Sequence, residues 1–401
     1  MPPHPPRVAV LGAGPIGLEA ALAAGNRGWP TVVYESAAGV AGNVRHWAHV
    51  SLFTPWDMNV SPRMRATLGS TAPDGRALPT GGDLIRHVYE PLAALAPVAH
   101  TLRLGWGVLA VGREGLLKHE RIGHPERARR PFRLLVRDPQ GGEHVHHADV
   151  VLDCTGTYGH PNALGDAGIP APGEQASSAH ITRHLPDLVA EARAWAGRTV
   201  LLSGAGHSAQ TAAVALAELA AHAPDTRVIW AVRAGQPDWY GVSDDPLPAR
   251  ARLTRRSREL AAGSSGAVQV RLGHVTDSLA PAGERVEVTL RNGRPERLLV
   301  DRILALNGGV GDHSIYRQLQ VHECYATSGP IKLAATLLGE SGGDCLAQTG
   351  HGPDVLTNPE PGFFVLGAKS YGRNSRFLLR IGWGQVDEVF GLLDVQRAVG
   401  G

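Results

Sequence analysis

Two glycine-rich turns, each placed between a short apolar run and an alanine-rich run, constrain the fold more than any other feature of the sequence. The first is Gly12-Ala-Gly-Pro-Ile-Gly17, preceded by Arg7–Leu11 and followed by Leu18–Gly25. A buried strand, a tight turn and a helix in this order open a βαβ unit, whose helix N-terminus can face a bound phosphate. The next apolar run, Thr31–Glu35, ends in an acid that can accept hydrogen bonds from ribose hydroxyls. The pattern predicts a dinucleotide site, with a tight structural turn as the alternative.

The second turn, Gly204-Ala-Gly-His-Ser-Ala209, lies between the apolar run Arg198–Ser203 and a helix expected over Gln210–His222. The run that follows, Arg227–Arg233, ends in arginine where the first unit has an acid. A guanidinium suits the 2′-phosphate of NADPH, which a carboxylate would repel. We therefore expect NADPH rather than NADH at this unit. The alternative is that Arg233 is an exposed arginine at a strand end.

Two such units in one chain predict two bound nucleotides, FAD at the first and a nicotinamide cofactor at the second. Two further apolar runs end in small-residue turns, Cys154-Thr-Gly156 and Asn307-Gly-Gly309, and are typical of chain crossovers between domains. A single hydrophobic core stops growing at about 250–300 residues, so a chain of 401 residues predicts more than one domain. The sequence thus predicts two Rossmann-like, three-layer α/β domains. We expect an FAD domain over residues 1–165 and 300–401, with an NAD(P) domain inserted over residues 166–299.

Composition and charge exclude several other classes of protein. The 39 Lys and Arg residues, against 37 Asp and Glu, form no basic stripe, which argues against nucleic acid as a partner. No apolar run approaches the roughly 18 residues of a membrane span, and the N-terminus lacks the layout of a signal peptide. We therefore expect a cytoplasmic protein without a membrane partner; a homodimer stays open. The 50 glycines do not indicate disorder, because 43% of the residues are hydrophobic.

The arrangement resembles the two-dinucleotide-binding-domain flavoproteins, the superfamily of thioredoxin-reductase-like enzymes and class B flavin monooxygenases. The resemblance rests on both turns, Glu35, Asp153–Gly156 with His160-Pro161, and Gly362-Phe-Phe-Val-Leu-Gly367. It implies FAD at the first turn, NAD(P)H at the second, and a C-terminal segment against the flavin. The residues expected to hold the cofactors are Gly12, Gly14, Pro15, Ile16, Gly17, Glu35, Ser36, Asn43, Trp47, Val108, Thr155, Gly156, Gly204, Gly206, His207, Ser208, Ala209, Arg233, Gly367, Ala368 and Phe377; no metal site is expected.

The cysteines separate the two branches of this superfamily. Its dithiol reductases carry a C-x-x-C or similar pair beside the flavin, and this chain has only Cys154, Cys324 and Cys345. The stretch Gly39–Trp47 resembles the G-G-x-W segment of class B monooxygenases, although Pro172–His180 lacks the aromatic of their F-x-G-x-x-x-H fingerprint. The resemblance favours an FAD monooxygenase that uses NADPH and molecular oxygen, forms a C4a-hydroperoxide and oxygenates a small soluble amine or sulfur nucleophile.

Three residues are candidates for catalysis by this resemblance. Asn59 is expected to donate a hydrogen bond beside the flavin, and a turn-forming role is its alternative. Lys369 and Arg373 follow Gly367 where the reductases have Gly-Asp, and can stabilise negative charge at the N1–C2 carbonyl edge of the flavin. Their alternative is a basic loop that caps a helix expected over Leu378–Leu393.

Two other functions are compatible with the sequence. One is a reductase of a disulfide, quinone or other acceptor, for which Cys324 and Cys345 would have to meet in the fold. The other is a sensor that binds FAD without catalysis. An intact second turn argues against the sensor, because a protein that only holds FAD does not need a nicotinamide site.

Overall fold

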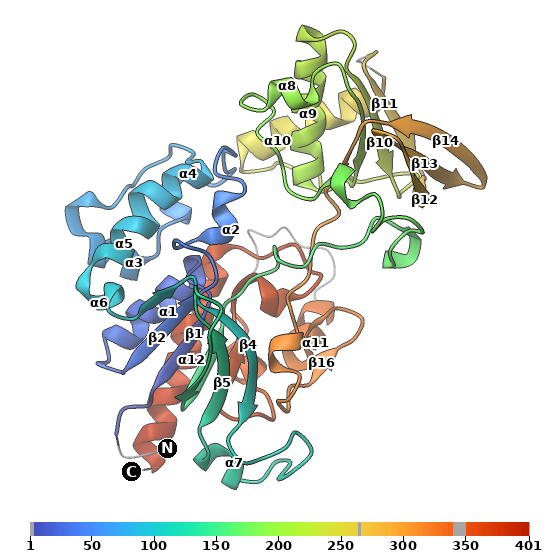
Figure 1. Ribbon diagram of the computed structural model, residues 1–401. Coiled ribbons are helices and arrows are strands. Elements are labelled where there is room, and N and C mark those ends of the chain that lie inside the picture. Colours follow the sequence, from blue (N-terminus) through green and yellow to red (C-terminus); the bar gives the residue numbers. More distant parts are fainter. Residues whose placement is uncertain (1–3, 264–265, 340–349, 401) are drawn as a thin grey trace. The chain divides into compact units, whose positions relative to one another are not determined.

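The computed structural model describes residues 4–263, 266–339 and 350–400 of the chain. The chain divides into two compact units, one made of Met1–His160 and Val310–Gly401, the other of Pro161–Gly309. The second unit is thus inserted into the first, as the sequence predicts (Figure 1). The chain leaves and re-enters the first unit at adjacent residues, because the Val310 amide donates to the His160 carbonyl over 3.0 Å.

The inserted unit comprises Pro161–Gly309, whereas the sequence predicts residues 166–299. Its strand β15 (Arg302–Ala305) pairs in parallel with β9 (Thr199–Ser203), so the run expected to open the third segment belongs to the second sheet. The second crossover therefore follows β15, in the turn Asn307-Gly-Gly309 that the sequence marks. The boundary at residue 299 is corrected for this reason.

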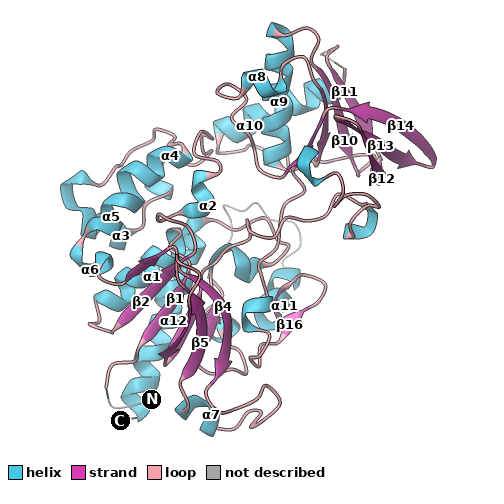
Figure 2. Cartoon of the chain, in the orientation of Figure 1, coloured by secondary structure: helices cyan, strands magenta, loops and turns pink. Residues whose placement is uncertain are grey.

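The first unit has a five-stranded parallel sheet at its centre (Figure 2). The order of the strands is β18 (Phe363–Val365), β7 (Val150–Asp153), β1 (Val8–Leu11), β2 (Thr31–Glu35) and β3 (Leu102–Leu104). Strand β1 is fully buried, as expected of a strand covered on both faces. Its carboxyl end, at Leu11, is in register with Tyr34 and Asp153. The turns that follow these strands therefore meet at one edge of the sheet.

Two further layers cover this sheet. Val8 and Val10 of β1 pack in the same cluster as α1 (Pro15–Gly25) and α12 (Leu379–Gly400). Ala9 and Leu11, on the opposite face, pack with an antiparallel sheet of β4 (Gly107–Arg113), β5 (Phe132–Arg137) and β6 (Glu143–Ala148). The alternation follows from the period of two in a strand. Helix α12 starts one residue later and ends seven residues later than the expected Leu378–Leu393.

The rest of the first unit consists of short elements. They are α2 (Gly42–Arg45), α3 (Pro62–Leu68), α4 (Gly81–Leu84), α5 (Glu90–Ala94), α6 (Ala96–Ala99), α7 (Glu126–Arg129), α11 (Ile331–Gly339), and the hairpin strands β16 (Glu323–Cys324) and β17 (Gly329–Pro330). Ser61 caps α3 by accepting a hydrogen bond from Met64, and Thr80 with Asp83 forms a capping box on α4.

The inserted unit repeats the three-layer plan. Its parallel sheet has the order β11 (Val268–Leu272), β10 (Arg227–Val232), β9, β15 and β8 (Ile181–Thr182). Its helices are α8 (Ala192–Trp195), α9 (His207–His222) and α10 (Pro248–Ala261), and its antiparallel sheet is β12 (Val275–Ala282), β13 (Arg285–Asn292) and β14 (Arg294–Val300). Helix α9 begins at His207, earlier than the expected Gln210, because the glycine turn leads directly into its first turn.

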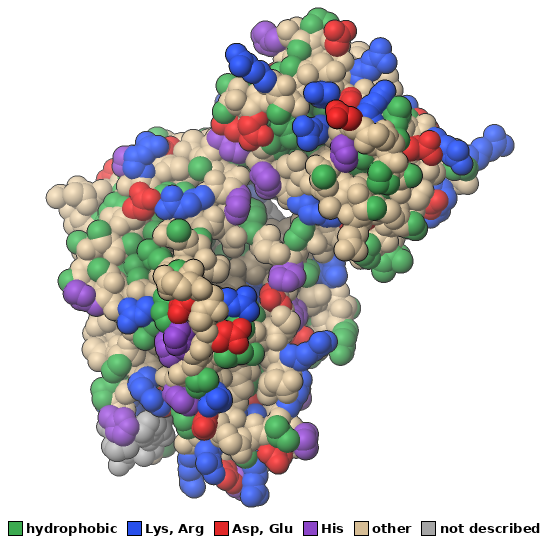
Figure 3. Space-filling view, viewed as in Figure 1, with side chains coloured by type: hydrophobic (Ala, Val, Ile, Leu, Met, Phe, Trp, Pro, Cys, Tyr) green, Lys and Arg blue, Asp and Glu red, His purple; other side chains and the backbone are tan. Residues whose placement is uncertain are grey.

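Charged side chains of both signs are interspersed on the face shown in Figure 3, as the balanced composition predicts. Within the described part of the chain, no helix has the length and apolar character needed to cross a membrane. Among the same residues, no group of three or more His, Cys, Asp or Glu side chains is placed to hold a metal ion.

Candidate functional site

The first glycine-rich turn is closely packed at two of its three glycines. Gly12 has a φ of +94°, and a Cβ atom on it would lie 2.8 Å from the carbonyl oxygen of Cys154. A Cβ atom on Gly17 would lie 1.8 Å from the carbonyl oxygen of Gly12. Only glycine fits these two positions without displacing backbone. The turn after β1 is therefore held against the turn after β7.

Gly14 differs from the other two glycines because it faces open space. A Cβ atom there would meet no heavy atom within 4 Å. Gly14 directly precedes α1, with Pro15 as the first helical residue, so the unpaired backbone N–H groups of the first helical turn border this space. A helix N-terminus with an accessible glycine is the arrangement that lets a pyrophosphate approach the backbone.

Glu35 ends β2 beside this turn and is buried. Its Oε2 accepts a hydrogen bond from the Ala13 amide at 2.8 Å, and its Oε1 accepts one from the Ala37 amide at 2.9 Å. A carboxylate can accept about four hydrogen bonds, so both oxygens keep capacity for ribose hydroxyls. The expected neighbours Ser36 and Asn43 are exposed, Ser36 just after β2 and Asn43 in α2. These residues fit the adenosine ribose of a dinucleotide.

Trp47 is the expected residue with the clearest unsatisfied group. Its indole Nε1 is buried and has no hydrogen-bond partner among the described residues. Its ring stacks on Tyr158, with centroids 6.4 Å apart, and a Cβ atom on Gly81 would lie 2.7 Å from it. A buried donor without a partner costs free energy unless a ligand or water accepts its hydrogen. Trp47 thus fits a contact with a bound ligand such as the flavin.

The C-terminal segment lies against the first turn. Gly367 has a φ of +74°, and a Cβ atom on it would lie 3.2 Å from the Ile16 side chain. The Gly367 amide donates to Oε1 of Gln385 on α12 at 2.8 Å. A Cβ atom on Gly382 would lie 2.4 Å from Ile16 and 2.8 Å from Phe377, so this corner has no spare room. The structure thus brings Ile16, Gly367, its neighbour Ala368 and Phe377 together.

Thr155 and Gly156 follow β7, whose neighbour in the sheet is β1. The Thr155 hydroxyl donates to Oδ1 of Asp153 at 2.7 Å, and its amide donates to the same oxygen at 3.1 Å. Gly156 has a φ of +72°, and a Cβ atom there would meet no heavy atom within 4 Å. Val108 lies on β4, partly buried in the cluster between the central sheet and the antiparallel sheet. The backbone of Val108 pairs with Val136 of β5 in the antiparallel sheet.

The side chain of Asn59 is buried and holds its own loop. Its Nδ2 donates to the carbonyls of Thr54 and Pro55, each at 2.8 Å. Its Oδ1 accepts from the Thr54 hydroxyl at 3.1 Å. These contacts correspond to the turn-forming alternative, because a hydrogen bond to a flavin would require Nδ2 to release one carbonyl.

The two candidate cations after Gly367 differ in their surroundings. Lys369 is fully buried, and its ammonium contacts Asp153, Thr155 and Asp312. Arg373 is exposed, and its backbone amide donates to the Thr327 carbonyl at 2.7 Å. The structure therefore directs Lys369 into the protein.

The second turn, in the inserted unit, repeats the build of the first. Gly204 has a φ of +123°, and a Cβ atom on it would lie 2.4 Å from the carbonyl oxygen of Leu306. A Cβ atom on Gly206, the residue before α9, would meet nothing within 4 Å. Ala209 takes the third position and is fully buried. The tight position, the open glycine and the helix N-terminus thus recur in the same order.

Polar side chains lie around the second turn and the N-terminus of α9. Burial lowers the pKa of His207, the first residue of α9, and the charge of Arg250 lowers it further. Ser208 is exposed at the same helix end. Arg233 is exposed and directly follows β10, a position that corresponds to that of Glu35 at the end of β2 in the first unit. Within the described segments it has no ion-pair or hydrogen-bond partner. This guanidinium is free to bind a phosphate.

The thiols do not form a pair in the described residues. Burial raises the pKa of Cys154, which sits in the turn beside Gly12, and the charge of Asp153 adds to this effect. Cys324 lies on the β16–β17 hairpin, and the neighbouring Thr327 lowers its pKa. Cys345 lies outside the described residues, so the meeting of Cys324 and Cys345 that the reductase alternative requires stays open.

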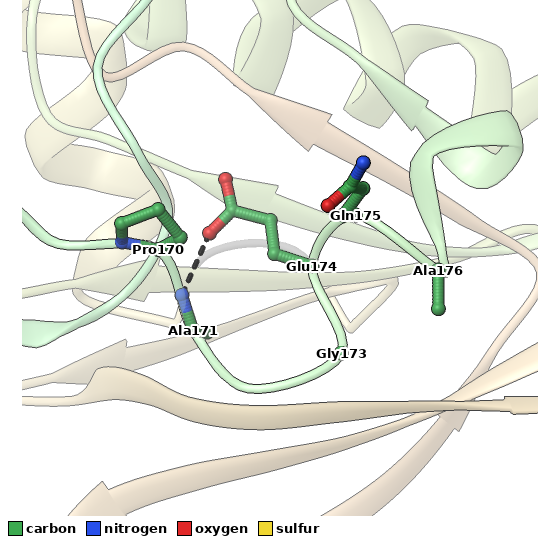
Figure 4. Close-up of a pocket in the computed structure, with 6 residues that line it drawn as sticks. All are labelled: Pro170, Ala171, Gly173, Glu174, Gln175 and Ala176. Carbon is green, nitrogen blue, oxygen red and sulfur yellow. Dashed lines mark hydrogen bonds between the residues drawn. The ribbon is translucent and has the colours of Figure 1, made fainter.

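An open pocket of about 510 Å³ lies elsewhere in the inserted unit (Figure 4). Its charged residue is Glu174, whose Oε2 accepts from the Ala171 amide at 2.8 Å and whose Oε1 pairs with Arg183 at 2.5 Å. The backbone that lines the pocket is also closely packed, because a Cβ atom on Gly173 would lie 1.8 Å from the carbonyl oxygen of Leu279. Glu174 thus holds the connecting segment together and offers no free acid.

Sequence reasoning missed three residues that organise the first site: Asp153, Asp312 and Gln385. Asp153 ends a buried apolar run exactly as Glu35 does, and this signal was present in the sequence. Gln385 is a polar residue at a buried position of a long helix, between Ile381 and Val389 in helical spacing. Asp312 contributes through its backbone carbonyl, for which a sequence carries no signal.

No protein-family model matches the chain, and no curated protein sequence matches it either. Solved structures do match it. The bacillithiol disulfide reductase Bdr (YpdA) from Bacillus cereus is 17% identical, with a TM-score of 0.72 over 98% of this chain and 100% of that one. The ornithine hydroxylase PvdA from Pseudomonas aeruginosa is 14% identical, with a TM-score of 0.64 over 98% and 100%.

The thioredoxin reductase of T. acidophilum is 14% identical, with a TM-score of 0.59 over 97% of this chain and 99% of that one. Reductases and a hydroxylase thus share one architecture with this chain along its whole length. At these identities the likeness concerns the fold, and the site must supply the argument for function. The chain has the fold of the two-dinucleotide-binding-domain flavoproteins, the superfamily that its sequence resembles.

Proposed function

We propose that this protein is an FAD-dependent oxidoreductase that takes electrons from NADPH. The observation that supports it is the repeated build of the two turns, each with a closed glycine and an open glycine before a helix. A tight structural turn has no need of open space at its second glycine, whereas a pyrophosphate does. FAD, when bound, supplies the flavin that accepts a hydride from the nicotinamide.

The protein groups then bind and orient the two nucleotides. Gly14 and the N-terminus of α1 receive the FAD pyrophosphate, Glu35 accepts hydrogen bonds from its ribose, and Trp47 donates from its buried Nε1. Gly206 and the N-terminus of α9 receive the nicotinamide dinucleotide, and Arg233 binds its 2′-phosphate. NADH, which lacks that phosphate, is the poorer donor in this proposal.

For the final electron acceptor we propose molecular oxygen, in a monooxygenase that acts on a small soluble amine or sulfur nucleophile. The support is the state of the thiols. Cys154, the cysteine beside the first turn, is buried with a raised pKa, and the described residues place no second cysteine next to it. Thiol–disulfide exchange needs an accessible thiolate. By its name, one of the proteins that share the fold is a hydroxylase of ornithine, a small soluble amine.

A second candidate is a reductase that passes electrons to a disulfide. The observation that favours it is the place of Cys154, whose carbonyl oxygen lies 2.8 Å from where a Cβ on Gly12 would be. This contact places the backbone of Cys154 beside the first turn, where the FAD is proposed to bind. The bacillithiol disulfide reductase of the same fold makes a low-molecular-weight disulfide the acceptor to test.

Stopped-flow absorbance of the purified protein tests these proposals in order. A yellow protein that NADPH bleaches faster than NADH supports the oxidoreductase and its donor. Mixing the reduced protein with oxygen should then give a transient absorbance distinct from those of oxidised and reduced flavin. Immediate reoxidation with stoichiometric peroxide contradicts the monooxygenase, and rapid reoxidation by a disulfide in the absence of oxygen favours the reductase. No bleaching by either nucleotide would contradict both.

A further inference from the structure

Lys369 and Asp153 form a buried ion pair that the sequence does not predict. From the sequence, Lys369 is expected to face the flavin, and Asp153 has no role beyond its place in a motif. Both side chains are completely buried, and Nζ of Lys369 lies 2.5 Å from Oδ2 of Asp153. Asp153 ends β7, and Lys369 follows β18, the neighbouring strand. Charged side chains are almost never this deeply buried unless they are paired.

The lysine has no free donor. Its ammonium carries three hydrogens. They are taken by Asp153, by the carbonyl oxygen of Asp312 at 2.6 Å and by the hydroxyl of Thr155 at 3.1 Å. The ring of Tyr316 lies 5.0 Å from Nζ and adds a π face. Every neighbour of the ammonium suits its charged form, and none of its hydrogens is available to a flavin.

The aspartate is equally committed. Its Oδ1 accepts from the amide and the hydroxyl of Thr155, and its Oδ2 accepts from Lys369. The pair therefore forms a closed network with no net charge. Two further carboxylates interact with the charge of Lys369. They are Asp312, whose carboxylate lies 3.9 Å from the His160 ring, and Glu323, whose carboxylate lies 2.8 Å from the His313 ring.

The pair lies where the three proposed flavin-binding segments meet. The carbonyl of Asp153 accepts from the Leu366 amide at 2.9 Å, which ties the turn after β7 to the C-terminal segment. The carbonyl group of the next residue, Cys154, packs against Gly12 of the first turn. Gly367, two residues before Lys369, packs on Ile16 at the start of α1. A charge at this point is shielded from water, because both side chains of the pair are completely buried.

We propose that the Asp153–Lys369 pair sets the reduction potential of the bound FAD, by keeping the buried polar network beside it at zero net charge. This inference rests on the proposed function. Reduction adds negative charge to the flavin, so a buried charge of either sign nearby changes the equilibrium. Buried charges are weakly screened, and a pair broken on one side leaves the other charge uncompensated. Lys369 thus acts through its charge, which balances that of Asp153, and not through a hydrogen bond to the flavin.

Three variants test the proposal through the flavin midpoint potential, measured against reference dyes during slow reduction. Lys369→Met leaves the carboxylate alone and should lower the potential. Asp153→Asn leaves the ammonium alone and should raise it. The double variant, Asp153→Asn with Lys369→Met, removes both charges and should return the potential close to that of the unmodified protein. Lys332→Met, an exposed lysine of α11 in the same unit, is the control and should cause no shift.

The signs separate this inference from a purely structural role. Single variants that shift the potential in the same direction, or not at all, overturn it while leaving the oxidoreductase proposal intact. Loss of flavin from all three variants, with the fold retained by circular dichroism, also overturns it and assigns the pair to cofactor retention. An unmodified protein that holds no flavin contradicts the proposed function itself, and the inference with it.

Discussion

The carbonyl oxygen of Gly12 lies 1.8 Å from the point that a Cβ atom on Gly17 would occupy, so the first and last glycines of the turn are in contact through backbone. Gly14, between them, faces open space. The same turn thus contains one glycine with no room for a side chain, Gly17, and one glycine with open space beside it, Gly14. Replacing each of them with alanine distinguishes a packing role from a ligand-binding role.

Gly17→Ala and Gly14→Ala should therefore fail in different ways. A methyl group at residue 17 displaces backbone, and we expect a loss of about 3 kcal/mol of unfolding free energy or more. A methyl group at residue 14 meets no protein atom, so we expect a stability change within about 1 kcal/mol, with at least a tenfold loss of bound flavin. Chemical denaturation and the flavin content of the purified proteins measure both. Full flavin content in Gly14→Ala would contradict the phosphate site.

Arg233→Ala should weaken NADPH and spare NADH. A charge-assisted hydrogen bond to a phosphate contributes about 1.5–3 kcal/mol, which corresponds to a rise of roughly 10- to 100-fold in KM for NADPH. Arg227→Ala, at the exposed opposite end of β10, is the matched control and should change neither. Steady-state flavin reduction with both nucleotides gives the comparison. An equal loss for NADPH and NADH would remove the assigned role of Arg233.

The features that could be predicted from sequence are those in which the chemistry is local. Gly12, Gly14 and Gly17 lie within six residues, and their turn determines strand, helix and phosphate site together. The second turn repeats the pattern, so the inserted topology followed from two local signals. The small-residue turn ending at Gly309 also marked the second crossover, although the boundary itself was placed too early.

Features that depend on distant partners could not be predicted. The assignment of β15 required its pairing with β9, about one hundred residues earlier in the chain. Lys369 and Asp153 lie 216 residues apart in the sequence. Without this partner, the sequence predicts a lysine whose charge faces a ligand. In the structure, the ammonium group is buried in an ion pair. Asn59 illustrates a different limit. Binding a flavin and holding a turn would both use the same amide hydrogens of its side chain, so the residue type does not distinguish them. The structure shows that these hydrogens go to the carbonyls of Thr54 and Pro55.

The stability of the protein should depend on His207 at mildly acidic pH. Burial lowers its folded pKa below the ordinary value of 6.5, so the folded state binds this proton less readily than the unfolded state. The stabilisation is present above the ordinary pKa and is lost as the pH falls through the folded one. Between pH 7.5 and pH 5 the unmodified protein should lose more unfolding free energy than His207→Gln. His222→Gln, at the exposed other end of α9, serves as the control, and equal slopes for all three proteins would refute the prediction.

Asn59→Ala should destabilise the protein by about 1–3 kcal/mol, because it removes a buried amide that satisfies the Thr54 and Pro55 carbonyls. Asn43→Ala, an exposed asparagine of α2, should have almost no effect. The fraction of NADPH-derived electrons that ends as peroxide should stay unchanged in both. A higher peroxide yield at unchanged stability would instead assign Asn59 to the oxygen reaction.

The reactivity of the thiols should follow their surroundings. Burial and Asp153 raise the pKa of Cys154, so its thiol is protonated at neutral pH. The neighbouring Thr327 and Ala326 lower the pKa of the partly exposed Cys324. Iodoacetamide at pH 7 should therefore label Cys324 at least tenfold faster than Cys154, as peptide mass spectrometry can show. Thr327→Val should slow the labelling of Cys324, and Thr336→Val, on α11, should not. Rapid labelling of Cys154 in the flavin-reduced protein would shift the choice of acceptor from oxygen to a disulfide.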